Sequence, residues 1–314
     1  MSPPAQPEAA ELGRRLRAGD RTAGPAALNV IEDRSPAGRE RAAALLGEVG
    51  VADGAHLVGV TGPPGAGKSS LLSALVSAWR DAGRTVAVLA VDPSSKRSGG
   101  SLLGDRARIE HDPRDDGVLI RSTAAGGRLG GLAPPTREAA FALASAFDIV
   151  VVETVGVGQS ETDVEELCDT TVVVVQPASG DTLQFLKAGI MEVPDVLVVT
   201  KADLGDVALR AERDLRAALR ALGVTATPVV SVSSIPPTQG IEHLVEAIEA
   251  HREGLDIAAS RRRSRQLAAI AEFTAEHGER ALRALGGRRA TEQLLADAPP
   301  ESTTAELIEL LAKG

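Results

Sequence analysis

The sequence has no tyrosine, one tryptophan and four phenylalanines, so aromatic residues make up only 2% of its 314 residues. Basic residues are also in the minority, because 34 Lys and Arg stand against 43 Asp and Glu and give a net charge of −9. Proteins that bind nucleic acid present a basic surface and often offer aromatic side chains on which bases stack. The composition therefore argues against nucleic acid as a partner.

Cysteine occurs once, at Cys168, just before an apolar run of strand length. A single cysteine excludes an internal disulfide bond and any metal cluster built from cysteines. We expect Cys168 to be a small buried hydrophobic residue, with a reactive thiol as the alternative. The histidines lack the spacing of metal ligands, so we expect them on the surface or in packing roles; they are His56, His111, His243, His251 and His277.

Long hydrophobic runs are missing as well. The apolar stretches have the length of strands, and the first thirty residues contain no continuous hydrophobic region like that of a signal peptide or membrane helix. We therefore expect no membrane association and a cytoplasmic location. A hydrophobic content of 43% in 314 residues is nevertheless sufficient for a substantial core.

Runs rich in β-branched residues alternate with helical patterns along most of the chain. This alternation is typical of repeated βαβ units and predicts an α/β fold with a mostly parallel sheet. Several runs are apolar at every position, as expected for strands that helices cover on both faces. The seven expected strands are residues 56–61, 85–92, 117–122, 148–154, 170–177, 195–203 and 227–234.

The two ends of the chain have a different composition. Residues 8–49 and 258–313 are rich in Ala, Leu, Arg and Glu at helical spacing. Within the second stretch, the tract RRRSRQ at 261–266 is either a basic patch for a partner or a solvated helix face. We expect an N-terminal helical extension (1–50), a central α/β domain (51–255) and a C-terminal helical arm for dimerisation or docking (256–314).

The strongest chemical signal is GPPGAGKS at residues 62–69, which lies between the first expected strand and a helical pattern. It matches G-x-x-x-x-G-K-[ST], whose glycines let successive backbone N–H groups point at phosphates. Lys68 would contact the β- and γ-phosphates and the Ser69 hydroxyl would ligate Mg²⁺. A turn that binds nothing is the alternative. The expected nucleotide contacts here are Gly62, Pro63, Pro64, Gly65, Ala66, Gly67, Lys68, Ser69 and Ser70.

The identity of the base is addressed by TKAD, residues 200–203. In N/T-K-x-D motifs the aspartate accepts hydrogen bonds from guanine, and the lysine stem covers the ring; adenine would leave that carboxylate unpaired. Asp203 and Lys201 therefore predict GTP rather than ATP. Thr200 stands where asparagine is commoner. Farther on, Ser233 and Ser234 could offer backbone N–H groups to the guanine carbonyl oxygen.

Three carboxylates stand where a metal ion and an attacking water would need them. Asp92 ends the second expected strand, Glu153 ends the fourth, and Asp105 lies in a glycine-rich stretch. Parallel sheets bind ligands at the carboxyl ends of their strands, so all three can converge on the phosphate loop. Carboxylates hold Mg²⁺ and orient water for attack on the γ-phosphate. As an alternative, each could be a turn or capping residue.

Taken together, the motifs resemble those of the MeaB/ArgK family, which includes the human MMAA protein. The resemblance covers roughly residues 10–255 and is carried by GPPGAGKSS, VDPSS, SGGSLLGDRARIE, GGRLGGL, ETVGVGQSETD, PASGDTLQFLKAGI and TKAD. It implies a P-loop GTPase of the SIMIBI class that serves as a chaperone for an adenosylcobalamin-dependent acyl-CoA mutase, usually methylmalonyl-CoA mutase. It also implies a homodimer built with the C-terminal helices. An older family label, a kinase for arginine or ornithine transport, finds no second substrate pocket in this sequence.

The resemblance assigns further roles. It implies that Lys68 and Asp105 with Glu153 form the catalytic set, and that Ser69, Asp92, Asp105 and Glu153 surround the metal. Gly156 would be the switch glycine that senses the γ-phosphate. The segment with Asp181, Gln184 and Lys187 resembles an extra switch toward the mutase.

The position of Gln159 predicts how fast GTP is hydrolysed. In Ras-like proteins a glutamine directly follows the switch glycine and orients water, whereas Val157 follows Gly156 here. We therefore expect slow intrinsic hydrolysis that a partner accelerates, with Gln159 directed to the partner.

Three other functions compete with this hypothesis. A nickel-delivery GTPase would need a His-rich tract or a Cys/His pair, and the sequence has neither. A scaffold that binds GTP without hydrolysing it would act through its helical ends. An ATP-dependent kinase would not depend on Asp203 for nucleotide affinity.

Overall fold

The computed structural model describes residues 6–92, 109–124, 132–154, 160–177 and 194–313. The chain folds into two compact units. The helical unit contains residues 1–54, 137–146 and 256–314, and the sheet unit contains residues 55–136 and 147–255. Among the helices of the described residues, none combines the length and the apolar character needed to cross a membrane.

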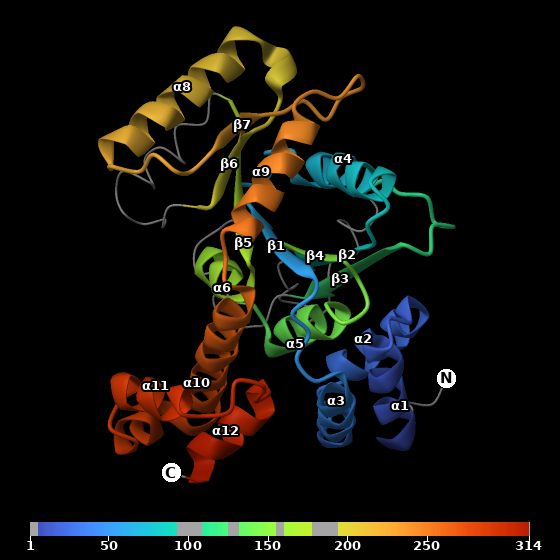
Figure 1. Ribbon diagram of the computed structural model, residues 1–314, viewed down its shortest axis with the longest axis vertical. Helices are drawn as coiled ribbons and strands as arrows, with labels where there is room; N and C mark the ends of the chain where they lie inside the picture. The colour runs from blue at the N-terminus through green and yellow to red at the C-terminus, as the bar shows by residue number, and fades with distance from the viewer. Residues whose placement is uncertain (1–5, 93–108, 125–131, 155–159, 178–193, 314) are drawn as a thin grey trace. The chain divides into compact units, whose positions relative to one another are not determined.

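The sheet unit contains seven strands, all parallel, in the order β3-β2-β4-β1-β5-β6-β7 (Figure 1). The predicted α/β fold is thus confirmed. All seven expected strands are present: β1 (His56–Thr61), β2 (Val86–Asp92), β3 (Val118–Ala124), β4 (Ile149–Thr154), β5 (Thr170–Val175), β6 (Val196–Val199) and β7 (Val229–Ser231).

The strands β5, β6 and β7 end earlier than expected. The largest difference is at β6, which stops at Val199, so that the TKAD segment continues into the 3₁₀ helix η3 (Ala202–Leu204). Lys201 takes a left-handed conformation with φ of 57°. Residues other than glycine rarely adopt this backbone conformation.

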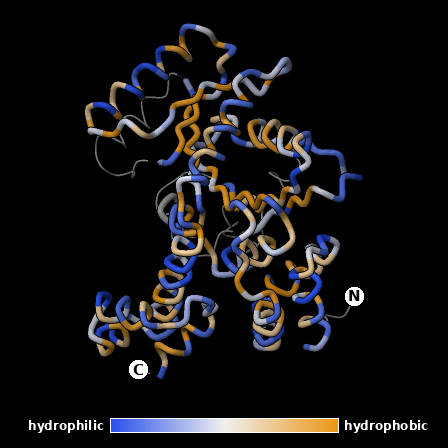
Figure 2. The backbone as a smooth tube through the Cα atoms, in the orientation of Figure 1, coloured by the Kyte–Doolittle hydropathy of each residue, from blue (hydrophilic) through white to orange (hydrophobic). Residues whose placement is uncertain are grey.

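Alternation along β5 and β6 shows why these strands are apolar throughout. Val172, Val174, Val196 and Val198 belong to a core with helices α4 (Lys68–Asp81) and α9 (Ile241–Glu253). The intervening residues, Val173, Val175, Leu197 and Val199, pack with α8 (Asp206–Ala221). Both faces of the strands are therefore covered, as the continuous apolar pattern predicts. Figure 2 shows the same apolar character along the strands.

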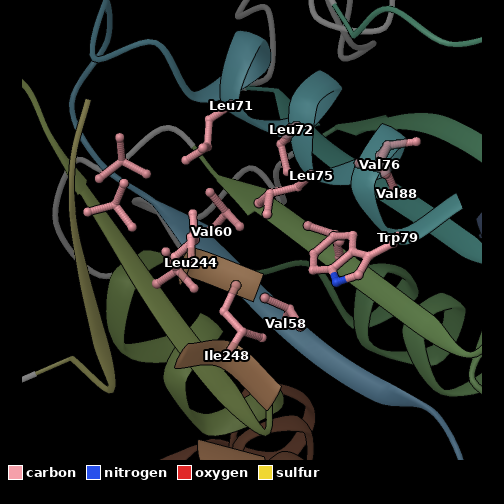
Figure 3. Close-up of a cluster of buried hydrophobic side chains, with 14 of the residues drawn as sticks. Val58, Val60, Leu71, Leu72, Leu75, Val76, Trp79, Val88, Leu244 and Ile248 are labelled. Atoms are coloured by element: carbon pink, nitrogen blue, oxygen red, sulfur yellow. The ribbon is translucent and has the colours of Figure 1, made fainter. Parts of the chain in front are cut away.

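The first of these cores positions the helix that follows the phosphate loop. Leu71, Leu72, Leu75 and Trp79 project from α4, and Figure 3 shows them directed at Val60 and Val88 of the sheet and toward Leu244 and Ile248 of α9. All of these side chains are essentially buried. The spacing of the α4 residues, at i, i+1, i+4 and i+8, is that of one helix face.

Two histidines form hydrogen bonds at the amino-terminal ends of β1 and β5. His56 Nε2 lies 2.8 Å from Thr170 Oγ1, which lies 2.9 Å from His251 Nδ1. His251 Nε2 in turn lies 3.0 Å from Asp195 Oδ1. These bonds join the starts of β1 and β5 to α9, so both histidines have a structural role. Cys168 is buried, as expected.

The helical unit contains helices from both ends of the chain. Its N-terminal part comprises α1 (Gln6–Arg17), η1 (Arg21–Ala23), α2 (Gly24–Glu32) and α3 (Pro36–Val49). Its C-terminal part comprises α10 (Ile257–Ala284), α11 (Arg288–Ala296) and α12 (Thr304–Lys313), which share an apolar core. Helix α10 has a break in its helical conformation at Gly278. Residues 137–143 of helix α5 (Pro134–Leu143) also belong to this unit, whereas α6 (Ser160–Leu167) belongs to the sheet unit.

Candidate nucleotide-binding site

The phosphate loop, residues 62–67, connects β1 directly to the first residue of α4. Gly65 and Gly67 have φ angles of 75° and 88°, which favour glycine. At Gly62 a Cβ atom would lie 2.4 Å from the Val174 carbonyl oxygen, so a larger residue would force the loop off β5. No side chain caps the start of α4, whose N–H groups and positive dipole end therefore face the loop. This backbone fits an anionic phosphate group.

Lys68 and Glu153 form a buried pair behind this loop. Lys68 Nζ donates to the Gly62 carbonyl at 2.8 Å and to the Pro63 carbonyl at 3.3 Å. It also lies 3.8 Å from Glu153 Oε1, and the two side chains are 7% and 3% exposed. Strand pairing produces this arrangement, because β4 lies beside β1 with Glu153 opposite Val60. The structure thus brings two of the three predicted catalytic residues together.

Thr200 has a role that the sequence did not reveal. Its hydroxyl donates to the Ala66 carbonyl oxygen at 2.7 Å and lies 3.2 Å from the Val175 carbonyl oxygen. The side chain is 3% exposed. Thr200 therefore ties the phosphate loop to the ends of β5 and β6. The position of TKAD after a strand could have indicated a structural role for Thr200. It could not have indicated Ala66 as the partner, because Ala66 lies 134 positions earlier in the chain.

Lys201 makes a second connection between the base motif and the phosphate loop. Its Nζ donates to the Gly65 carbonyl at 3.2 Å and to Gln176 Oε1 at 2.9 Å. The residues of TKAD and the phosphate loop therefore form one continuous site.

Asp203 lies close to the predicted SVSS segment. The Ser233 hydroxyl donates to Asp203 Oδ1 at 2.9 Å, and Asp203 is exposed whereas Ser233 is buried. The prediction for the Ser233 backbone needs correction, because its N–H donates to the Gln239 carbonyl at 3.0 Å. That N–H is engaged in a bridge between 233 and 239, so Ser234 remains the candidate for contacting the guanine carbonyl oxygen.

Several predicted residues lie wholly or partly outside the described part of the chain. Asp92 is the last residue of β2, whose residue Ala90 pairs with Glu153, but the Asp92 side chain is outside the described part. Asp105, Gly156, Gln159, Asp181, Gln184 and Lys187 lie outside the described residues altogether. Among the described residues, no cluster of three or more His, Cys, Asp or Glu side chains could hold a metal ion. The predicted Mg²⁺ site includes Asp92 and Asp105, so it stays a prediction.

A further contact joins two of the family-like motifs. Asp163 of α6, from ETVGVGQSETD, accepts a hydrogen bond from the Leu132 backbone N–H at 2.7 Å. Leu132 is the last residue of GGRLGGL and is buried. Asp163 therefore holds the end of one motif against the helix that follows the predicted switch glycine. The sequence contained no signal for this pairing.

Comparison with known proteins identifies the family of this site. A family model described as methylmalonyl-CoA mutase-associated GTPase MeaB matches residues 25–284. The chain belongs to the MeaB family. The resemblance expected from the motifs is therefore confirmed, and this MeaB-family chain is a member of a P-loop GTPase family whose fold implies binding of a guanine nucleotide.

Relatives agree with this assignment over most of the chain. A probable GTPase of Mycobacterium tuberculosis is 41% identical over 268 residues, which are 82% of this chain and 79% of that protein. The mitochondrial methylmalonic aciduria type A homolog of Caenorhabditis elegans is 40% identical over 219 residues, 66% of this chain and 55% of the relative. A crystal structure of LAO/AO transport system kinase has a TM-score of 0.68 and 28% identity, covering 99% of both chains.

Proposed function

We propose that this chain binds GTP with Mg²⁺, hydrolyses it slowly, and uses the cycle to gate the loading of adenosylcobalamin into an acyl-CoA mutase. Methylmalonyl-CoA mutase is the first candidate, because the matching family is described by its association with that enzyme. The observation that supports nucleotide gating best is the buried Lys68–Glu153 pair, which couples the phosphate loop to the strand that leads into the predicted switch.

The described residues suit the two ends of GTP. The backbone of the phosphate loop and Lys68 would hold the phosphates, and Ser69 would ligate Mg²⁺. Asp203 and the Lys201 stem would hold guanine, with Ser234 N–H directed to the base carbonyl. Because Thr200 and Lys201 both bond to carbonyl groups of the phosphate loop, base and phosphate sites are held in one arrangement. Base recognition therefore also positions the phosphates.

Hydrolysis needs an oriented water and neutralisation of phosphate charge rather than covalent catalysis. Glu153 is a buried carboxylate beside Lys68, and we assign it the role of holding the attacking water or a water bound to Mg²⁺. Bound Mg²⁺ would neutralise charge on the β- and γ-phosphates. Asp92, Asp105 and Gly156 keep their predicted roles in the metal site and in sensing the γ-phosphate.

Gating follows from the position of Glu153 in the chain. It lies two residues before 155–159, which contains Gly156 and Gln159. Loss of the γ-phosphate beside the Lys68–Glu153 pair would therefore affect this segment directly. The effect would then reach α6, where Asp163 accepts a hydrogen bond from Leu132 N–H. A partner that binds these segments would alter the rate of hydrolysis by favouring one arrangement of them.

The first experiment measures release of γ-phosphate from GTP by the wild type, Lys68→Ala and Asp105→Ala. We expect slow release by the wild type and a loss of release in both variants. A scaffold that binds without hydrolysis would show the same background rate in all three. A preference of the wild type for ATP over GTP would instead support a kinase.

The second experiment adds a cognate adenosylcobalamin-dependent mutase, starting with methylmalonyl-CoA mutase. We expect faster GTP hydrolysis and a dependence of cofactor loading on the nucleotide. Light scattering by the chain without mutase tests the homodimer that the resemblance implies. Rapid hydrolysis by the protein alone that no mutase alters would contradict the gating proposal.

A further inference from the structure

The arginine-rich tract at 261–266 lies on a cavity of the helical unit. The cavity has a volume of about 690 Å³. Arg262, Arg263, Arg265 and Gln266 line one wall from α10, and residues from 51–53 and 296–301 line the others. Known pockets for small molecules fall in the same range of volume. The tract is therefore neither a solvated helix face throughout nor an isolated basic patch.

Two of these arginines are held in place by neutral groups. Arg262 Nη2 donates to the Ala296 and Ala298 carbonyls, each at 2.7 Å. Arg265 donates to the Pro300 carbonyl at 2.7 Å and to the Ser302 carbonyl at 3.1 Å. These carbonyls fix the guanidinium groups but do not neutralise their charge. Both groups are thus positioned in advance beside the cavity, with their positive charge retained.

The three arginines of the cavity wall form no close ion pair, although Asp53 attracts Arg265 over a longer distance. In the described part of the chain, none of Arg262, Arg263 and Arg265 has a carboxylate oxygen within the 4.0 Å of an ion pair. Arg265 is only 6% exposed, and its burial lowers the pKa of the guanidinium. The carboxylates that share the lining are Asp53, Asp256 and Glu301, and all three are exposed.

The electrostatic potential in the cavity depends on the difference in burial between Arg265 and the three carboxylates. Water screens the exposed carboxylates and Arg263, whereas the buried guanidinium of Arg265 is screened far less. Asp256 is also engaged as the cap of α10, where it accepts from Ala259 N–H at 3.1 Å. The first turn of α10 lines the cavity through Ala258 and Ala259 and adds the positive end of its dipole. The cavity therefore favours an anion.

We propose that this cavity is a binding site for a small molecule that carries a phosphate group. Guanidinium groups match phosphate oxygens in pairs, and Arg263, together with the N–H groups that Arg262 and Arg265 do not donate to backbone carbonyls, supplies more donors than a carboxylate needs. Val51, Ala258 and Ala296 leave an apolar wall for an organic body. The site lies within the helical unit and does not depend on the phosphate loop.

Calorimetric titration of the full chain tests this site. The protein is first saturated with GDP and Mg²⁺, so that the phosphate loop is filled, and is then titrated with inorganic phosphate or phenyl phosphate. Arg263→Glu is the diagnostic variant, because Arg263 is exposed and makes no hydrogen bond or ion pair that holds the fold within the described residues. Arg213→Glu on α8 is the matched control, since it makes the same charge change at an exposed arginine of the sheet unit.

We expect binding of both probes by the wild type, tighter for phenyl phosphate, and unchanged binding by Arg213→Glu. In Arg263→Glu the affinity should fall by about tenfold or more, as expected when a charge-assisted contact becomes a repulsion. Preference for inorganic phosphate would identify a free phosphate as the ligand, and preference for phenyl phosphate a phosphate ester. Absence of binding, or equal affinity in both variants, would overturn the proposal.

Discussion

Replacing Lys68 with methionine should destabilise the sheet unit even without nucleotide. The substitution keeps the length of the side chain but leaves Glu153, which is 2% exposed, without its buried cation. At the observed 3.8 Å and an effective dielectric constant of about 20, the attraction lost is about 4 kcal/mol. Truncating one partner of a buried pair costs a similar amount, about 3–5 kcal/mol. We therefore expect a loss of about 3–5 kcal/mol of unfolding free energy.

Trp79 provides the assay, because it is the chain's single tryptophan and is 1% exposed in the core under α4. Its fluorescence during urea denaturation reports unfolding of the sheet unit. Glu153→Gln should cost less than Lys68→Met, about 1–2 kcal/mol, because Lys68 keeps its bonds to the Gly62 and Pro63 carbonyls.

The double variant separates the pair from its surroundings. Lys68→Met with Glu153→Gln removes both charges together, so it should be more stable than the sum of the single losses predicts. We expect a coupling energy of about 2–3 kcal/mol from the complete cycle. A coupling below about 0.5 kcal/mol would refute the reasoning, since the two charges would then contribute independently.

Three further predictions follow from the same contacts. Thr200→Val should lower the unfolding free energy by about 1–3 kcal/mol in urea denaturation and weaken GTP binding, because the buried Ala66 carbonyl loses its donor. Thr200→Ser keeps the hydroxyl and should therefore retain both the stability and the GTP affinity of the wild type. Asp203→Asn should weaken GTP binding by about tenfold or more in calorimetry and leave ATP affinity unchanged. If the variant bound GTP as tightly as the wild type does, Asp203 would not be the residue that recognises guanine. Burial, aided by the charge of Glu138, raises the pKa of Glu272 from 4.5 to about 7. The unfolded chain therefore loses this proton at lower pH, so stability should fall between pH 4.5 and 7 by at most about 3 kcal/mol, and Glu272→Gln should remove this slope in denaturation measured across that range.

The architecture of the sheet was accessible from the sequence because each strand carries its own signal. Runs such as 149–152 and 172–175 are apolar at every position, as expected for strands buried on both faces. The phosphate loop was equally accessible, since its glycine pattern and its place between a strand and a helix are local features. Local patterns thus predicted the fold and a loop whose backbone suits a phosphate group.

Contacts between distant segments were not accessible in this way. Thr200 looked like a residue that had lost an asparagine amide, yet its hydroxyl holds Ala66 in the phosphate loop. Ser233 N–H looked available for guanine, yet it bonds to Gln239, and the Ser233 hydroxyl bonds to Asp203 instead. In both cases the residue type was informative, but its partner was decided by how the strands end and turn.

The RRRSRQ tract shows most clearly what a one-dimensional pattern omits. Charge and helical spacing alone leave open whether such a tract meets a partner or water. In the structure its members have different environments. Arg265 is buried and donates to backbone carbonyls, Arg262 donates to a carbonyl at the end of α11, and Arg263 is exposed. A guanidinium held by neutral carbonyls keeps its charge, so the same contacts that stabilise the C-terminal helices also prepare a positive surface. Structural and binding roles are therefore not alternatives for this tract, and Arg263 is the position at which they can be separated.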